Sequence, residues 1–81
     1  MYEYIKGTAE DIGSDYIVLE AGGVGYYITA TGAAVNMCRI GENAKIYVYQ
    51  SVKEDGISLY GFASAEEKRM FLRLVSVSGI G

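Results

Sequence analysis

Apolar and polar residues alternate loosely, with a period of about two, in the first part of the chain, which is typical of a β-strand. The alternation runs through residues 2–11, and residues 16–20 follow as a run of mainly β-branched and aromatic side chains. Residues 26–30, 44–52 and 57–62 repeat this strand character. Five short strands spread over about sixty residues predict a mainly β fold in the form of a small barrel.

Turn-forming residues separate the predicted strands. A glycine, serine and aspartate cluster at residues 13–15 marks the first turn, and the glycines of residues 21–25 allow a tight hairpin. Residues 31–40 lack a clean period, so they predict a connector with room for one helical turn. Residues 53–56 form a charged turn that ends in an Asp-Gly pair, which is favoured in tight hairpins.

A helix is predicted after the last strand. Ser64 and Glu67 have the spacing of a capping box, in which two side chains bond the exposed amides at the start of a helix. Apolar residues then recur at spacings of three and four, as in an amphipathic helix that ends near Ser78. The apolar positions are Met70, Phe71, Leu74 and Val75, and the polar positions on the other faces are Glu66, Lys68, Arg69 and Arg73.

The composition and net charge of the chain mainly exclude classes of function. The net charge of −3 argues against a broad basic surface that grips a phosphate backbone. The chain has no histidine and one cysteine, Cys38, so the commonest general base, disulfides within the chain and paired-thiolate zinc sites are all excluded. No apolar run approaches the roughly 20 residues of a membrane span, and no secretion signal opens the chain. We expect a soluble, cytoplasmic domain without a cofactor or metal.

Three local features, taken in order, resemble the RuvA family of Holliday-junction branch-migration proteins. They are Gly22-Gly23-Val24-Gly25-Tyr26, then Lys53-Glu54-Asp55 with Leu59-Tyr60-Gly61-Phe62, then the helix that leads into Gly79-Ile80-Gly81. Each feature alone is common, but their joint occurrence and spacing cover essentially the whole chain. The resemblance implies a five-stranded OB-fold barrel at residues 1–63. Residues 64–81 would then hold one C-terminal α-helix and the start of a truncated helix-hairpin-helix motif.

The same resemblance implies a non-enzymatic function. Members recognise four-way junction DNA, assemble as homotetramers and act as the DNA-binding subunit of a branch-migration helicase. The motor is a separate ATPase, RuvB, which docks on a C-terminal domain absent from this chain, and the RuvC resolvase is a further partner. Two alternatives stay open, namely a generic OB-fold domain that binds single-stranded nucleic acid and a purely structural oligomerisation domain.

The resemblance also assigns the candidate site residues. Glu54 and Asp55 match an acidic pin that repels phosphates near the junction centre, whereas a charged turn without the resemblance is more often a solvated hairpin tip. Lys53 would either reach a phosphate beside the pin or balance local charge. The amides of Gly79, Ile80 and Gly81 would approach a phosphate in the longer protein, although by themselves these residues end a helix.

The eight tyrosines suggest a stacking platform for single strands, but the resemblance favours packing roles. The tyrosines assigned to the core and to subunit contacts are Tyr26, Tyr27, Tyr47, Tyr49 and Tyr60. Cys38 is interpreted as a small apolar filler. Glu54 and Asp55 offer too few converging ligands for a metal or acid/base site.

Overall fold

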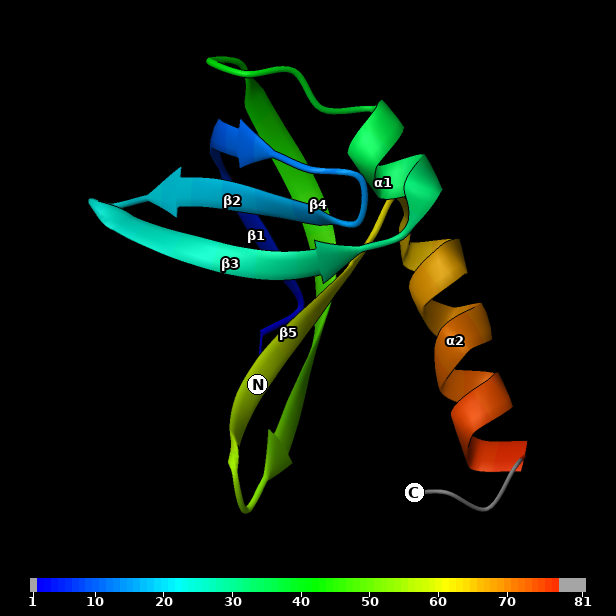
Figure 1. The fold of residues 1–81 in the computed structure, drawn as a ribbon. Coiled ribbons are helices and arrows are strands. Elements are labelled where there is room, and N and C mark those ends of the chain that lie inside the picture. Colours follow the sequence, from blue (N-terminus) through cyan, green and yellow to red (C-terminus); the bar gives the residue numbers. More distant parts are fainter. Residues whose placement is uncertain (1, 78–81) are drawn as a thin grey trace.

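The computed structural model describes residues 2–77, which contain five strands and two helices (Figure 1). The order is β1 (Tyr4–Ile12), β2 (Tyr16–Ala21), β3 (Val24–Ala30), α1 (Gly32–Asn36), β4 (Asn43–Lys53), β5 (Gly56–Phe62) and α2 (Ala65–Val77). The predicted strands are confirmed with boundaries shifted by one or two residues. The helical turn expected in the connector is α1, and the predicted helix end at Ser78 lies outside the described residues.

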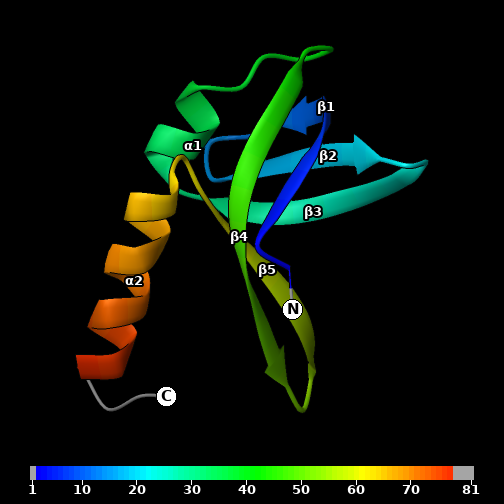
Figure 2. The ribbon, with the colours of Figure 1, turned by 180° about the vertical axis from the view of Figure 1, so that it is seen from behind.

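The five strands close into a barrel in the order β1-β2-β3-β5-β4, which confirms the predicted five-stranded OB-fold barrel with a C-terminal helix. Strand β1 belongs to both halves of the barrel, since Tyr4–Thr8 pair with β4 and Thr8–Ile12 pair with β2. A bulge between Ala9 and Asp11 interrupts the second pairing. Bulges bend a strand and increase its twist, and Figure 2 shows β1 crossing between β4 and β2.

Strands β3 and β5 close the barrel through a short parallel seam. Thr29 pairs with Tyr60 and Ala30 pairs with Gly61, and no further pair joins these two strands. Gly61 has no space for a side chain here, because the side chains of Ile28 and Ile46 fill the position that a Cβ would occupy. A Cβ at this position would lie 2.5 Å from Ile28 Cγ2 and 2.8 Å from Ile46 Cγ2.

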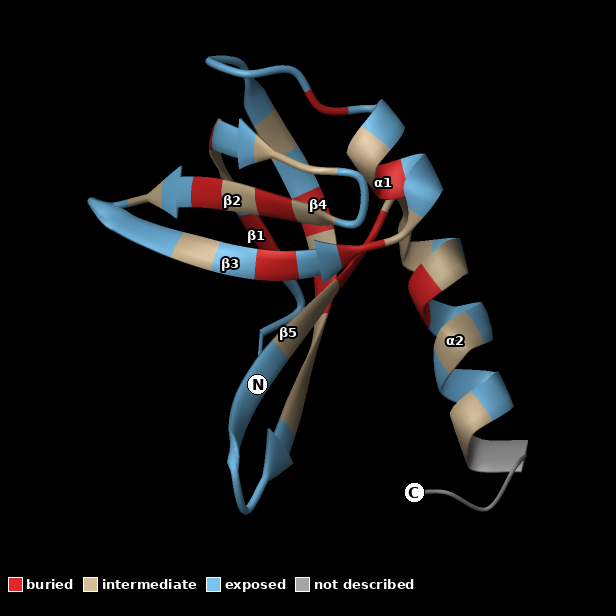
Figure 3. Cartoon of the chain, in the orientation of Figure 1, coloured by how far each residue is buried: buried red, intermediate tan, exposed pale blue. Residues whose placement is uncertain are grey.

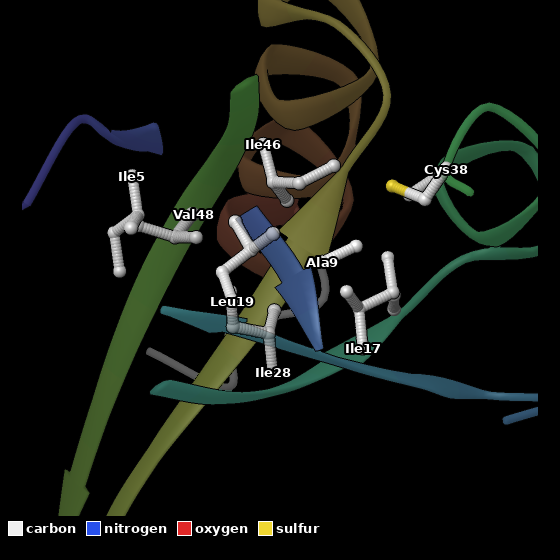
Figure 4. Packing of buried hydrophobic residues seen from close by; sticks show 10 residues of the cluster. Ile5, Ala9, Ile17, Leu19, Ile28, Cys38, Ile46 and Val48 are labelled. Carbon is white, nitrogen blue, oxygen red and sulfur yellow. The ribbon is translucent and has the colours of Figure 1, made fainter. Parts of the chain in front are cut away.

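The core fills the barrel interior and extends under α1 (Figures 3 and 4). The largest fully buried side chains are Ile17, Leu19, Ile28, Ile46 and Val48. Cys38 lies at the edge of this cluster as a buried free thiol, which confirms its interpretation as an apolar filler. Burial raises the pKa of the Cys38 thiol, because the thiolate loses hydration inside the protein.

Side chains at the start of α2 tie it to the barrel. Ser64 Oγ accepts a hydrogen bond from Glu67 N at 3.1 Å, as the capping box predicts. Glu67 Oε1 accepts from Ala63 N at 2.8 Å and from Thr31 Oγ1 at 2.9 Å, so this carboxylate bonds residues outside α2. Thr31 also caps α1 by accepting from Ala34 N. The two helix starts therefore share one hydrogen-bonded connection.

The predicted buried face of α2 was wrong in part. Phe71 packs on the rings of Tyr49, Tyr60 and Phe62, with centroids 5.0–6.5 Å apart. Met70 and Leu74, however, are 64% and 65% exposed. Lys68 was expected on a polar face of the helix, but it is buried. The face of α2 that meets the barrel therefore includes Lys68 and differs from the predicted one.

A long-range ion pair explains how Lys68 is accommodated. Its Nζ lies 3.2 Å from Glu3 Oε1 and also donates to the Glu3 carbonyl at 3.5 Å. The same carbonyl accepts from Val48 N, so the segment before β1, the middle of β4 and α2 meet at one point. A buried ammonium is tolerated because it finds these two partners.

Candidate nucleic-acid interface

The β4–β5 hairpin projects beyond the barrel and carries the predicted acidic residues at its tip (Figure 1). The two strands stay paired from Tyr47 and Phe62 to Lys53 and Gly56. Strand β3 leaves β5 after the short seam, so the outer half of the hairpin lacks a neighbouring strand on that side. All residues from 52 to 58 are exposed. The hairpin thus presents its tip to solvent on a two-stranded arm.

Glu54 and Asp55 are the two central residues of the hairpin turn. Lys53 and Gly56 form the last pair of the ladder on either side of them, so the charged turn expected at residues 53–56 is present. No non-glycine residue in the described range has a positive φ, whereas Gly56 has a φ of +148°. Glycine at this position absorbs the unusual backbone conformation. The two acidic residues are consequently consecutive in the turn at the end of the arm.

The tip carboxylates have no cationic partner within residues 2–77. The ion pair found in this range joins Lys68 to Glu3, neither of which belongs to the hairpin. The side-chain hydrogen bonds of the described residues include none from Lys53, Glu54 or Asp55. Lys53 is exposed beside the tip and does not neutralise either carboxylate through a contact. The tip therefore shows its full formal charge to solvent.

The remaining predicted contact residues are Gly79, Ile80 and Gly81, and they lie outside the described residues. Within the described range, no group of three or more histidine, cysteine, aspartate or glutamate side chains is arranged to hold a metal ion. Neither helix of that range is long and apolar enough to cross a membrane.

An aromatic groove of about 440 Å³ lies where β3 and the hairpin diverge. Tyr2, Tyr26 and Tyr27 line one side, and Ile57 and Leu59 line the other. The Tyr2 and Tyr26 rings meet edge to face with centroids 6.3 Å apart. Hydrophobic side chains thus gather beside the acidic arm.

The tyrosines assigned to packing divide into two sets. Tyr26, Tyr47, Tyr49 and Tyr60 are half-buried, in agreement with the prediction, but Tyr27 is 60% exposed. Tyr27 stacks on Tyr16 at 5.0 Å, outside the core. The Tyr16 hydroxyl donates to Asp11 Oδ2, and this hydrogen bond to a carboxylate raises the pKa of Tyr16. Tyr27 therefore lies outside the core, and of the two packing roles predicted for these tyrosines a subunit contact is the one that stays a prediction for it.

The amino-acid sequence of the chain is similar to those of several known proteins that share one name. Across the whole chain, 51% of residues are identical to a protein of Hathewaya histolytica, and 51% to one of Listeria monocytogenes serotype 4a. A protein of Streptococcus sanguinis is 48% identical over the whole chain. All three are called Holliday junction branch migration complex subunit RuvA.

The chain spans 40–42% of the length of these curated relatives. A family model described as the RuvA N terminal domain matches residues 1–61, which include all of the barrel except the last residue of β5. Since this match covers most of the chain and the identity with the relatives extends over all of it, the chain belongs to the RuvA N-terminal domain family.

Proposed function

We propose that this chain is the junction-recognition and assembly module of a Holliday-junction branch-migration subunit, and that it has no catalytic activity of its own. Its family membership and the names of its relatives support this proposal. The observation that carries it is the exposed hairpin arm with Glu54 and Asp55 consecutive at the tip. Such a tip disfavours an approaching phosphate and leaves the rest of the domain free to bind other parts of the DNA.

The proposed pin works by accumulated repulsion. Two unit charges about 10 Å apart interact by only about 0.4 kcal/mol in bulk water. One carboxylate facing one phosphate therefore decides little. In a homotetramer, four hairpins would bring eight carboxylates around one axis, where the phosphates of an intact duplex would otherwise converge. Strands that separate and turn outward would avoid this charge.

The wider complex is part of the proposal. Four-way junction DNA is the ligand, and a second protein of the RuvB type supplies ATP-driven movement through a domain beyond this chain. A RuvC-type resolvase would act on the same junction in the cytoplasm. Residues 79–81 would offer backbone amides to a phosphate in the longer protein, and Lys53 would contact a phosphate beside the pin.

The pin is tested by removing its charge in the full-length protein. Glu54→Gln combined with Asp55→Asn should tighten binding to linear duplex and so reduce the preference for a junction of equal length. Both affinities are measured at one near-physiological salt concentration, because salt alone shifts them strongly. Glu10→Gln combined with Glu42→Gln is the matched control, since both residues are exposed and lie outside the hairpin.

The control variant should keep the junction preference of the unmodified protein. An unchanged preference in the pin variant would refute the repulsion mechanism and favour a purely structural assembly role. Equal binding of the unmodified protein to junction and duplex would refute junction recognition itself.

A further inference from the structure

The outer face of β1 and β4 carries two lysines directly opposite each other. The register pairs Tyr4 with Tyr47, Lys6 with Lys45, and Thr8 with Asn43. Both lysines are exposed, and their strands lie side by side in the view of Figure 2. Three matched cross-strand pairs thus form a row with positive charge at its centre.

This pairing is unfavourable for the isolated barrel. Like charges directly opposite in an antiparallel pair destabilise a sheet, because their Cβ atoms are only about 4.5–5.5 Å apart. Within the described residues, neither lysine forms an ion pair. Glu20 is the nearest carboxylate by register on β2, but it pairs with Thr8, one row farther along. The chain carries ten acidic residues, yet within residues 2–77 none neutralises this pair by a direct contact.

Side chains of the neighbouring cross-strand pairs contact Lys45 and flank the two lysines. The Lys45 ammonium lies 4.2 Å from the ring centroid of Tyr4 and 5.2 Å from that of Tyr47. These cation–π contacts hold Lys45 over the aromatic pair and leave Lys6 exposed beside it. On the other side of the lysine pair, Thr8 Oγ1 donates a hydrogen bond to Asn43 Oδ1 at 3.1 Å. This bond uses the amide oxygen of Asn43 and leaves the two N–H donors of its amide nitrogen for another acceptor. Cations, amide donors and aromatic edges therefore share one open surface.

We propose that Lys6 and Lys45 form a phosphate-contact site for the nucleic-acid backbone. This inference rests on the proposed function, but it concerns a different surface from the acidic tip. Lys53 lies eight positions after Lys45 on β4, which corresponds to about 26 Å of extended strand. The lysine pair would thus contact an arm of the DNA away from the junction centre. Phosphate binding would offset the repulsion that the pair causes in the free protein.

The test is the salt dependence of DNA binding by the full-length protein with Lys6→Gln. The slope of log K against log salt should become shallower by about 0.9 for each phosphate that the variant no longer neutralises. Arg39→Gln is the control, since it removes one exposed positive charge outside the sheet. Lys6→Arg should restore the slope. The Tm of Lys6→Gln should stay equal or rise, because a repulsive neighbour is gone, and Lys6→Glu should raise the Tm further while weakening binding more.

A slope equal to that of the Arg39→Gln control would overturn the site. A changed oligomeric state with an unchanged slope would also overturn it, and would assign the lysines to an acidic surface of another subunit instead. The ratio of junction to duplex affinity should survive Lys6→Gln, because the acidic tip is intact. A shallower slope in a protein without junction preference would therefore refute the proposed function and leave the phosphate site standing.

Discussion

Gly61 is the position where one added methyl group should disturb the barrel most directly. A Cβ there would lie 2.5 Å from Ile28 Cγ2 and 2.8 Å from Ile46 Cγ2. Carbon atoms attract each other best at about 3.5–4.0 Å, so the two methyl groups would have to retreat by about 1 Å and 0.7 Å. Both isoleucines are fully buried in a close-packed interior. Gly61→Ala therefore forces a shift where little space is free.

The expected cost follows from this geometry. Overpacking a filled core destabilises a protein by about 1–3 kcal/mol. We expect about 2 kcal/mol for Gly61→Ala, because one small group displaces two neighbours. In a domain of this size, each kcal/mol lowers the Tm by about 4–8 °C, so the Tm should fall by about 8–16 °C.

Urea and thermal unfolding of the 81-residue chain measure this effect, with Gly25→Ala as the matched control. Gly25 is also a strand glycine, but a Cβ there would meet Val18 Cγ1 at an ordinary 3.7 Å. The control should be neutral or stabilising, because alanine loses less conformational entropy on folding. Equal stabilities of the two variants would refute the argument that close approach at the seam requires glycine.

The ion pair and the thiol give two further predictions. Glu3→Ala should destabilise the chain by about 1 kcal/mol in urea unfolding, whereas Lys68→Met should be closer to neutral, since only the first leaves a buried ammonium without its carboxylate. The reverse order would contradict this account. Because burial raises the pKa of Cys38, its contribution to stability is present below about pH 9 and is lost as pH rises above that value. Removing the thiol with Cys38→Ala should flatten this decline, and a thiol reagent should label native Cys38 much more slowly than unfolded Cys38.

The strands were predictable because each carries its own local pattern. Turn residues separate the hairpin-connected strands, and the β-branched and aromatic runs between them need no knowledge of distant neighbours. The capping box at Ser64 was predictable for the same reason. The acidic tip could also be located from the charged turn at residues 53–56, because the turn residues bracket Glu54 and Asp55.

Features that depend on contacts between distant segments could not be predicted from the sequence. The burial of Lys68 on α2 depends on Glu3, which lies 65 positions before it. A lysine at a helical position is normally assigned to solvent, and only the folded chain shows the carboxylate that admits it. The Lys6 and Lys45 pair is likewise a consequence of β1–β4 register. Neither lysine stands out in a sequence whose net charge is negative.

The short seam between β3 and β5 also has a consequence for how the barrel assembles and opens. It joins residues about thirty positions apart through two pairs, whereas β1 and β4, which are also distant in sequence, share five. Closing so long a loop costs chain entropy, and two pairs return little stabilisation. We expect the seam to form last. Amide hydrogens there, such as the Thr31 N–H that donates to the Gly61 carbonyl, should exchange with solvent while both flanking hairpins remain folded.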